Sequence, residues 1–250
     1  MFKKISYYHV FLVALVIFEK TYPQPVWINR YNEVISGRDG IKAIAADSLG
    51  NIYLAGWTGT INCADYLVIK LNSLGETLWT RTYNGPGNGH DCANAIAIDN
   101  LGNVYVTGES YGNDNNYDYA TVKFDVNGNQ QWLARYNGPG NGNDYAYAIA
   151  VDHFGNIYVT GESDGISSFS DFATIKYSPD GIELWVQRYN GADNDVDWAS
   201  GLWIDNAGNV YVVGTSYHNI TDNDYTTIKY DANGTCEWIR FYDGPASYDD

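Results

Sequence analysis

Apolar and polar positions alternate along most of the chain, and short groups of Asp, Asn and Gly interrupt the alternation. Residues 93–98 alternate in this way, and residues 104–107 are rich in β-branched and aromatic side chains. Two similar runs follow at 119–124 and 131–136. Alternation over four to eight residues between turn-forming residues is typical of half-buried β-strands. The stretch 91–143 therefore predicts four strands, named A to D here in chain order.

The same pattern recurs through the chain at a spacing of about 53 residues. Tryptophan marks the register with steps of 52, 53, 53 and 53, at Trp27, Trp79, Trp132, Trp185 and Trp238. A repeat of this length indicates a solenoid, a propeller or an array. We expect a repeat region over 25–250, with units at about 38–90, 91–143, 144–196 and 197–249. A residue kept in every copy serves the unit, whereas a residue found in one copy does not.

The connections between the strands are of two kinds. The A–B and C–D turns are tight, with Asp, Asn or Ser three residues before a Gly, as at Asp99 and Gly102. Such side chains accept backbone hydrogen bonds, and the Gly takes the left-handed conformation of a short hairpin. The B–C and D–A connections are longer and rich in Gly, Asn and Asp. Because successive strands alternate in direction, both long connections should lie at one end of the sheet.

The distribution of apolar residues predicts an all-β fold of the propeller type. Strands B and C carry apolar residues on both faces, as in a sheet covered on both sides. Strand A is small-sided: we expect Ala93, Ala95 and Ala97 on one face, and Ile96 and Ile98 on the other. Four-stranded antiparallel blades with the small first strand nearest the axis describe a β-propeller. A stacked β-solenoid is the alternative, although its repeats are usually shorter.

These motifs resemble a known repeat family. The unit Ala-x-Ala-Ile-Ala-x-Asp-x-x-Gly-Asn-Val-Tyr-Val-Thr-Gly, followed by Asp-Tyr-Ala-Thr-Val-Lys-Phe, Gly-x-x-x-Trp and Arg-Tyr-Asn-Gly-Pro-Gly, resembles the SBBP, or "seven-bladed β-propeller", repeat of bacterial exported proteins. The resemblance covers about residues 26–250. It implies a propeller and little about activity. The Gly-x-x-x-Trp stretch is also similar to the tryptophan motif of quinoprotein-dehydrogenase propeller repeats.

A count of strands predicts that the ring is not closed. A D-like strand, Trp27–Tyr31, precedes four complete units, and the last unit already has its own D strand around Trp238. The first D strand therefore cannot complete the last blade, because that blade already has four strands. We expect an open arc of four blades that is the front part of a longer array. A closed four-bladed ring is the alternative.

The N-terminus predicts export. Lys3 and Lys4 precede an apolar run at 10–18, which is too short to span a membrane and suits a signal peptide at 1–24. The cleavage site is not evident, and an uncleaved anchor is the alternative. We expect a secreted, cell-surface or periplasmic protein. A formal net charge of −16 argues against binding to nucleic acid or to an anionic membrane, beyond the signal segment.

The motifs do not predict an enzyme. Gly-x-Ser-x-Gly occurs around Ser110 and Ser163, but it lies in the repeat, no helix follows it, and the histidines share no register with it. We interpret the repeated Asp residues that end the long connections as acceptors of backbone N–H bonds. They are Asp65, Asp118, Asp171 and Asp224 after strand B, and Asp91, Asp144 and Asp197 after strand D. The repeated strand C lysines are expected to pair with such carboxylates.

Two groups of residues are candidates for ligand binding. Asp193, Asp195 and Asp197 alternate in one long connection, and their oxygens suit Ca²⁺, the one cofactor that the sequence suggests. Single aromatic residues vary between copies in the B–C connections: Trp57, Tyr111, Tyr117, Phe169 and Tyr217. We predict a non-enzymatic scaffold whose loop face binds a protein or a glycan. The alternative is part of a secreted enzyme, a quinoprotein-like dehydrogenase or a lyase, whose site lies outside this segment.

Overall fold

The computed structural model describes residues 37–60, 63–220 and 222–243. The regular structure of these residues is β-strand throughout, in sixteen strands. The strands are β1 Arg38–Ala46, β2 Ile52–Thr60, β3 Cys63–Leu71, β4 Thr77–Tyr83, β5 Asp91–Ile98, β6 Val104–Tyr111, β7 Tyr117–Phe124, β8 Gln130–Tyr136, β9 Asp144–Val151, β10 Ile157–Asp164, β11 Ser170–Tyr177, β12 Glu183–Tyr189, β13 Asp197–Ile204, β14 Val210–His218, β15 Asp222–Tyr230 and β16 Cys236–Tyr242. The predicted all-β class is confirmed.

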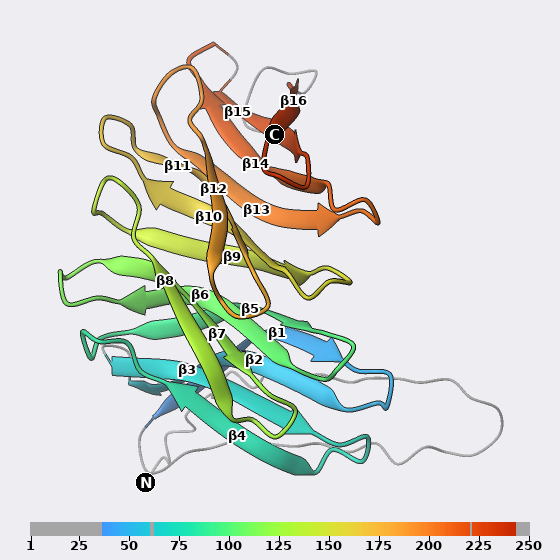
Figure 1. Cartoon of the computed structure of the whole chain (residues 1–250). Coiled ribbons are helices and arrows are strands. Elements are labelled where there is room, and N and C mark those ends of the chain that lie inside the picture. Colours follow the sequence, from blue (N-terminus) through green and yellow to red (C-terminus); the bar gives the residue numbers. More distant parts are fainter. Residues whose placement is uncertain (1–36, 61–62, 221, 244–250) are drawn as a thin grey trace, which may run out of the picture.

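The strands form four antiparallel meanders, each of four consecutive strands. The sheets are stacked in chain order, from β1–β4 at the bottom of Figure 1 to β13–β16 at the top. The backbones of the first strands lie close together, β1 with β5, β5 with β9, and β9 with β13, whereas the backbones of the fourth strands lie further apart. The sheets therefore fan outward from an inner row of first strands, as the blades of a propeller do.

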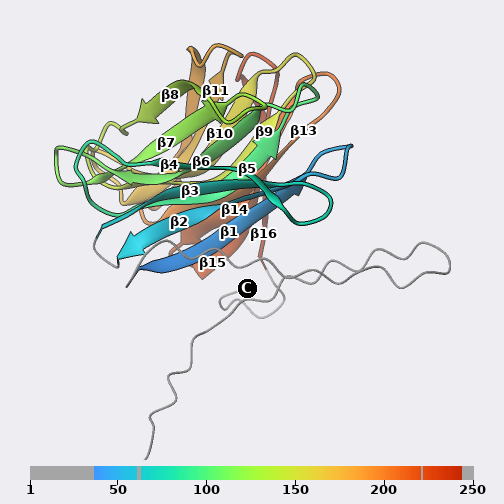
Figure 2. The ribbon, with the colours of Figure 1, turned by 90° about the horizontal axis from the view of Figure 1, so that it is seen from below.

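The arc is open. Among the described residues, no strand of the first sheet packs extensively against a strand of the last sheet. Figure 2 shows the stack from below, with β1–β4 in front of the sheets that follow. The predicted D-like strand at 27–31 and the predicted signal peptide lie outside the described residues. Within 37–60, 63–220 and 222–243 there is no helix long and apolar enough to span a membrane.

An apolar core fills each space between consecutive sheets. Tyr66 and Trp79 of the first sheet pack with Val122 of the second, and the second and third sheets repeat the arrangement. Tyr158 and Trp185 of the third sheet pack in the same way on the fourth. Trp79 and Trp185, two of the tryptophans that mark the repeat, thus lie in the cores between neighbouring sheets.

The faces of strand A differ from the prediction because each first strand contains a β-bulge. In β5 the pairing with β6 shifts between Ala93 and Ala95, so that Asn94 is the extra residue. A bulge reverses which face the following residues occupy. Ala93 therefore lies in the same core as Ile96 and Ile98, so the prediction that it faces away from them is wrong.

The tight turns have the predicted chemistry in all four sheets. Asp99 Oδ1 accepts hydrogen bonds from the backbone N–H groups of Leu101 and Asn103, both at 2.9 Å. Its Oδ2 accepts bonds from the Asn103 amide at 2.7 Å and the Tyr105 hydroxyl at 3.0 Å. Gly102 takes a φ of +81°, which favours glycine. The same bonds recur at Asp47, Asp152 and Asp205.

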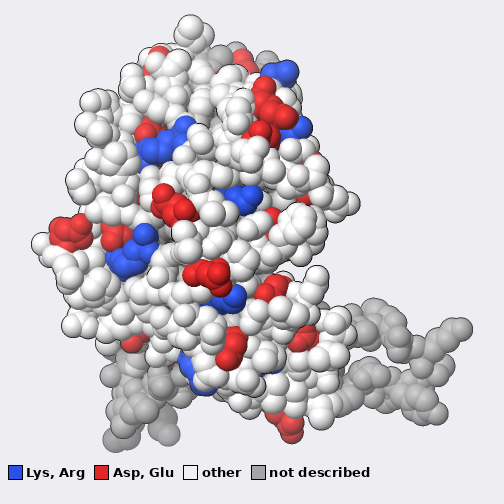
Figure 3. Space-filling model, viewed as in Figure 1, with Lys and Arg blue, Asp and Glu red and all other residues white. Residues whose placement is uncertain are grey.

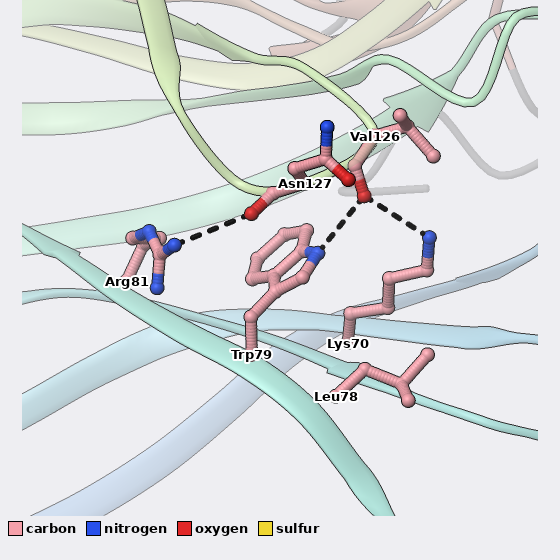
Figure 4. Close-up of a pocket in the computed structure, with 6 residues that line it drawn as sticks. All are labelled: Lys70, Leu78, Trp79, Arg81, Val126 and Asn127. Carbon is pink, nitrogen blue, oxygen red and sulfur yellow. Dashed lines mark hydrogen bonds between the residues drawn. The ribbon is translucent and has the colours of Figure 1, made fainter.

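Three of the four repeated lysines join neighbouring sheets through a backbone carbonyl: Lys70, Lys123 and Lys176. Lys70 Nζ and Trp79 Nε1 converge on the carbonyl oxygen of Val126, at 3.2 and 3.1 Å, and Arg81 reaches the carbonyl oxygen of Asn127 (Figure 4). The shallow cavity of about 490 Å³ at this place is therefore a joint between sheets. The joint recurs at Pro179 and Ala232. The expected pairing of these lysines with the repeated Asp residues is wrong, because the turn carbonyl of the next sheet takes that role.

Candidate binding site on the inner strands

The bulges place four different side chains at equivalent points of the inner row. Each bulge leaves one residue out of register between the first and second strands of its sheet. These residues are Lys42, Asn94, Tyr147 and Ser200, one from each of β1, β5, β9 and β13. Bulges commonly redirect a side chain beside a functional site. Here the backbone feature repeats while the chemistry that it presents changes.

A second set of varying positions lies on the neighbouring strands. Glu109 of β6 pairs with Cys92, and Glu162 of β10 pairs with Tyr145, while Trp57 and Thr215 take the same position in the first and last sheets. The residue just before each of these positions is a glycine in all four sheets: Gly56, Gly108, Gly161 and Gly214. A Cβ on Gly108 or Gly161 would collide with a backbone oxygen of the strand that carries the bulge. The backbone beside the varying side chains is therefore the same in each sheet.

Hydrogen bonds tie the two sets together. The Asn94 amide donates to Glu109 Oε2 and, at 3.1 Å, to the carbonyl oxygen of Ala146 in the next sheet. The Tyr147 hydroxyl donates to Glu162 Oε1 at 2.6 Å. Each glutamate is held by the side chain of the neighbouring bulge. The inner strands of the second and third sheets therefore present two carboxylates, an amide and a phenol.

Burial perturbs the titration of this cluster. It raises the pKa of the Glu109 carboxyl, while the hydrogen bond from Asn94 and the nearby Lys42 oppose the rise. Burial also raises the pKa of Glu162, against the hydrogen bond from Tyr147. The pKa of Tyr145 is raised to about 12, mainly by burial, then by the neighbouring Tyr117 and by the carboxylates of Glu109 and Glu162. Titratable groups with such shifts cluster at functional sites.

The aromatic candidates divide between this site and other places. Tyr117 lies between Tyr111 and Tyr145, with ring centroids 5.3 and 5.6 Å away, so two predicted residues join the inner cluster. Trp57 is 6.0 Å from the ring of His90, between the first two sheets. Phe169 is exposed at the tip of its connection, and Tyr217 is half-buried at the end of β14.

The Gly-x-Ser-x-Gly serines are held by half-buried arginines. Arg135 donates to Ser110 Oγ at 2.5 Å, to Asp118 Oδ2 at 2.7 Å and to the Tyr83 hydroxyl at 3.0 Å. Arg188 makes the same contacts with Ser163, Asp171 and Tyr136 in the third sheet. An arginine cannot act as a general base, so these serines have no activating group in it.

The repeated Asp residues split into two classes. Asp91, Asp144 and Asp197 accept bonds from the backbone N–H groups of Gly85, Gly138 and Gly191, as predicted. Asp118 and Asp171 instead pair with arginines, so the prediction of backbone acceptors is wrong at those two positions. The arginine positions are replaced by Thr82 in the first sheet and Phe241 in the last, which hid the pairing in the sequence.

The predicted calcium residues are engaged separately. Asp193 accepts bonds from the backbone and side chain of Asn219, at 2.9 and 2.6 Å, and Asp195 accepts one from the backbone of Val196. Asp197 binds Gly191 and Ser216. Across the described part of the chain, no three His, Cys, Asp or Glu side chains form a group that could hold a metal ion. A calcium site at these three residues stays a prediction.

The stacked four-stranded meanders and their inner cluster define a propeller-type repeat protein. The model of the SBBP β-propeller repeat family matches residues 27–61, 79–114, 131–169 and 184–221, which together are more than half of the 250 residues. The chain belongs to this family. No curated protein sequence matches it.

Solved structures share the fold at low identity. A protein of unknown function from Dyadobacter fermentans is similar with a TM-score of 0.52 and 12% identity, over 81% of this chain and 69% of that one. A quinohemoprotein alcohol dehydrogenase from Pseudomonas putida is similar at 0.46 and 12%, over 81% of this chain and 36% of that one. A gluconolactonase from Xanthomonas campestris is similar at 0.43 and 11%, over 80% and 61%. The chain thus spans only part of each enzyme, and at these identities the likeness concerns the fold alone.

The inner cluster escaped the sequence analysis, although the sequence carried its signal. Its amide and carboxylate residues are neither kept in every copy nor located in the long connections. Asn94 and Tyr147 lie inside strands, between alanines that do repeat. Asn94 and Tyr147 occupy equivalent positions in two repeats but have different side chains. A position of this kind, constant in register and variable in residue type, is the sequence signal for the cluster.

Proposed function

We propose that the protein is a non-enzymatic propeller scaffold that binds a neutral glycan at the inner strands of its second and third sheets. One observation carries the proposal: the side chains that change from sheet to sheet are concentrated at the bulges and at the positions beside them, while the surrounding scaffold repeats. Binding sites typically combine a rigid scaffold with a few varied polar and aromatic groups.

The chemistry of the cluster suits a sugar. Tyr117 and Tyr145 offer flat aromatic rings, and the half-exposed Tyr147 adds a third. Aromatic rings cover apolar faces and carry a polar tip. Glu109, Glu162 and the Asn94 amide supply acceptors and donors for hydroxyl groups. One amide and two carboxylates around three rings match a ligand with many hydroxyls better than an apolar one.

Charge favours a neutral ligand over an acidic one. Glu109 and Glu162 outweigh Lys42, the one cation of the bulge positions. The face shown in Figure 3 carries scattered Lys, Arg, Asp and Glu side chains with no broad patch of one sign. An anionic polymer would be repelled by a chain of formal charge −16. The predicted export fits an extracellular or cell-surface glycan.

The propeller-enzyme alternative is favoured by the raised pKa values of Glu109 and Glu162, because a carboxyl group whose pKa is raised by burial suits proton transfer. Against it, each glutamate already accepts a hydrogen bond from Asn94 or Tyr147. An enzyme acting on the glycan would release shorter or unsaturated products, and a binding protein would leave it intact. Chromatography of the glycan after incubation separates the two.

The test is binding to a panel of immobilised neutral oligosaccharides. We expect wild-type protein to retain at least one of them, and Glu162→Gln to weaken that binding at least tenfold, because the amide cannot accept as many hydroxyl donors. Phe154→Ser is the matched control, since Phe154 is 71% exposed at a tight turn. Failure of the wild type to bind any oligosaccharide, or equal loss in both variants, contradicts the proposal.

A further inference from the structure

We infer that the connection between β6 and β7 holds a divalent cation, Ca²⁺ by its chemistry, among Asp114, Asn116 and Asp118. This goes beyond the proposed glycan binding and involves a different loop from the Asp193–Asp197 connection. The three residues alternate in the connection, which turns back on itself through a bond from the Gly112 N–H to the Asn116 carbonyl at 2.8 Å. Alternating oxygen side chains in a tight loop are a common source of calcium ligands.

Three side-chain oxygens converge on one space. Asp114 Oδ1, Asn116 Oδ1 and Asp118 Oδ2 all lie within 3.4 Å of the position that a Cβ on Gly112 would occupy. Because Gly112 has no side chain, this position stays free for a ligand. The site uses an amide oxygen as well as carboxylates, so it differs from a group of three charged ligands. Carboxylate and amide oxygens are the ligands that Ca²⁺ takes.

The amide of Asn116 is the independent sign of a ligand. Asn116 is only 7% exposed, and its Oδ1 is buried with no hydrogen-bond partner. Its orientation is fixed, because the amide nitrogen donates to the carbonyl oxygen of Asn141 at 3.0 Å. The oxygen must therefore point toward Asp114 and Asp118. A buried acceptor left without a partner is costly, and a cation in this space would satisfy it.

The charge of the loop sets the expected affinity. Asp114 and Asp118 each bring a negative charge, and Arg135 pairs with Asp118 Oδ2 at 2.7 Å. With one of its two charges already balanced, the site should bind weakly, with a dissociation constant of about 10⁻⁴–10⁻³ M, as in extracellular calcium modules.

The third sheet contains a natural comparison. Gly165 takes the place of Gly112, and Asp171 with its partner Arg188 takes the place of Asp118 with Arg135. The space beside Gly165 is approached by Ser168 Oγ and Asp171 Oδ2. The second carboxylate and the buried amide oxygen are missing there. We expect this connection to bind no cation, although its backbone and its ion pair repeat.

A bound cation would also order the connection between β8 and β9, which lies beside the proposed glycan site. The connection ends at Tyr117, whose backbone N–H donates to Asn143 Oδ1 at 3.2 Å and whose ring contacts Tyr145. Asn137 donates to Asp114 Oδ2 at 3.3 Å. The loop is thus bonded to the connection between β8 and β9, and fixing one fixes the other.

The test is titration of the whole purified chain, stripped with a chelator, with Ca²⁺ followed by calorimetry and with Tb³⁺ followed by tyrosine-sensitised luminescence. Tyr111 is the sensitiser, since its hydroxyl lies 3.4 Å from Asn115 Oδ1 in the loop. We expect a single site, an at least tenfold loss of affinity in Asp114→Asn, and a similar loss in Gly112→Ala. Asp114 is exposed, so its variant should fold even where Gly112→Ala does not.

Asp193→Asn is the matched control, because it removes one carboxylate from the other calcium candidate. Unchanged affinity in this control and loss in Asp114→Asn support the inference. No saturable Ca²⁺ or Tb³⁺ binding by the wild type, equal binding by Asp114→Asn, or loss only in Asp193→Asn overturns it.

Discussion

The two ends of each sheet differ in what the repeat preserves. At the tight turns, one aspartate, one asparagine and one tyrosine make the same bonds four times, as at Asp99, Asn103 and Tyr105. At the other end, the bulges present a lysine, an amide, a phenol and a hydroxyl in turn. The comparison teaches that the tight turns and sheet joints hold the arc together, whereas the inner strands and long connections are free to take on a function.

The largest loss of stability is expected from a mutation at the end of the sheet that carries the long connections. It tests whether an ion pair there contributes to stability as the tight turns do. Arg188→Met removes the partner of buried Asp171 and four further hydrogen bonds, to the Tyr136 hydroxyl, to the side chain and backbone of Ser163, and to the backbone carbonyl of Asp164. Breaking a buried ion pair on one side destabilises by about 3–5 kcal/mol. We expect a loss of that size in the free energy of unfolding, measured with urea. Arg240→Met, at an exposed site, should change it by less than about 0.5 kcal/mol. Equal effects would show that the buried pair is not structural.

A smaller effect is expected at a tight turn. Asp152→Ala removes the acceptor of two backbone N–H groups, of the Asn156 amide and of the Tyr158 hydroxyl. Loss of such an acceptor costs about 1–3 kcal/mol when donors are left unpaired. The urea midpoint should fall accordingly. Asp180→Ala, at an exposed position of the next tight turn, serves as the control. A stability unchanged by Asp152→Ala would mean that the four identical turns do not hold the sheets.

Removing the repeated lysine should destabilise an interior sheet more than the last sheet. Lys123 donates to the Pro179 carbonyl at 3.0 Å, whereas its counterpart Lys229 pairs with Glu237 within its own sheet. We expect Lys123→Met to destabilise by about 1 kcal/mol, since Trp132 still satisfies that carbonyl. Lys229→Met should have a smaller effect, because the Lys229–Glu237 pair is partly exposed and such ion pairs contribute little. Matched losses in the two variants would argue that the lysine acts inside its sheet.

The last prediction concerns pH rather than a lost contact. Burial raises the pKa of Asp144 from 3.8 to about 6. The folded state then binds this proton more tightly than the unfolded state, so its contribution to stability is present below pH 3.8 and is lost as the pH rises to about 6. We expect Asp144→Asn to lack that fall. Urea unfolding of both proteins at several pH values between 4 and 7 measures it. If the free energy of unfolding depends on pH in the same way in both proteins, Asp144 is not the group responsible.

Much of the fold was predictable because its determinants are local. Asp99 and Gly102 define a turn within six residues, and the register of Trp132 is visible in the repeat itself. The bulge at Asn94 was not predictable, since a single extra residue reverses the faces of a strand without changing its composition. The Arg135–Asp118 pair also escaped, because two of the four sheets lack the arginine. The convergence on Gly112 depends on the folded shape of a loop.

The most direct measurement of the central claim is hydrogen–deuterium exchange with and without the oligosaccharide that the panel identifies. If the varying inner positions bind it, amide protection should increase in β9 around Tyr147, in β10 around Glu162 and in the connection before Tyr117. The tight turns at Asp99 and Asp152 should exchange at the same rate in both samples. Protection confined to the tight turns, with none around Tyr147 and Glu162, would contradict the account.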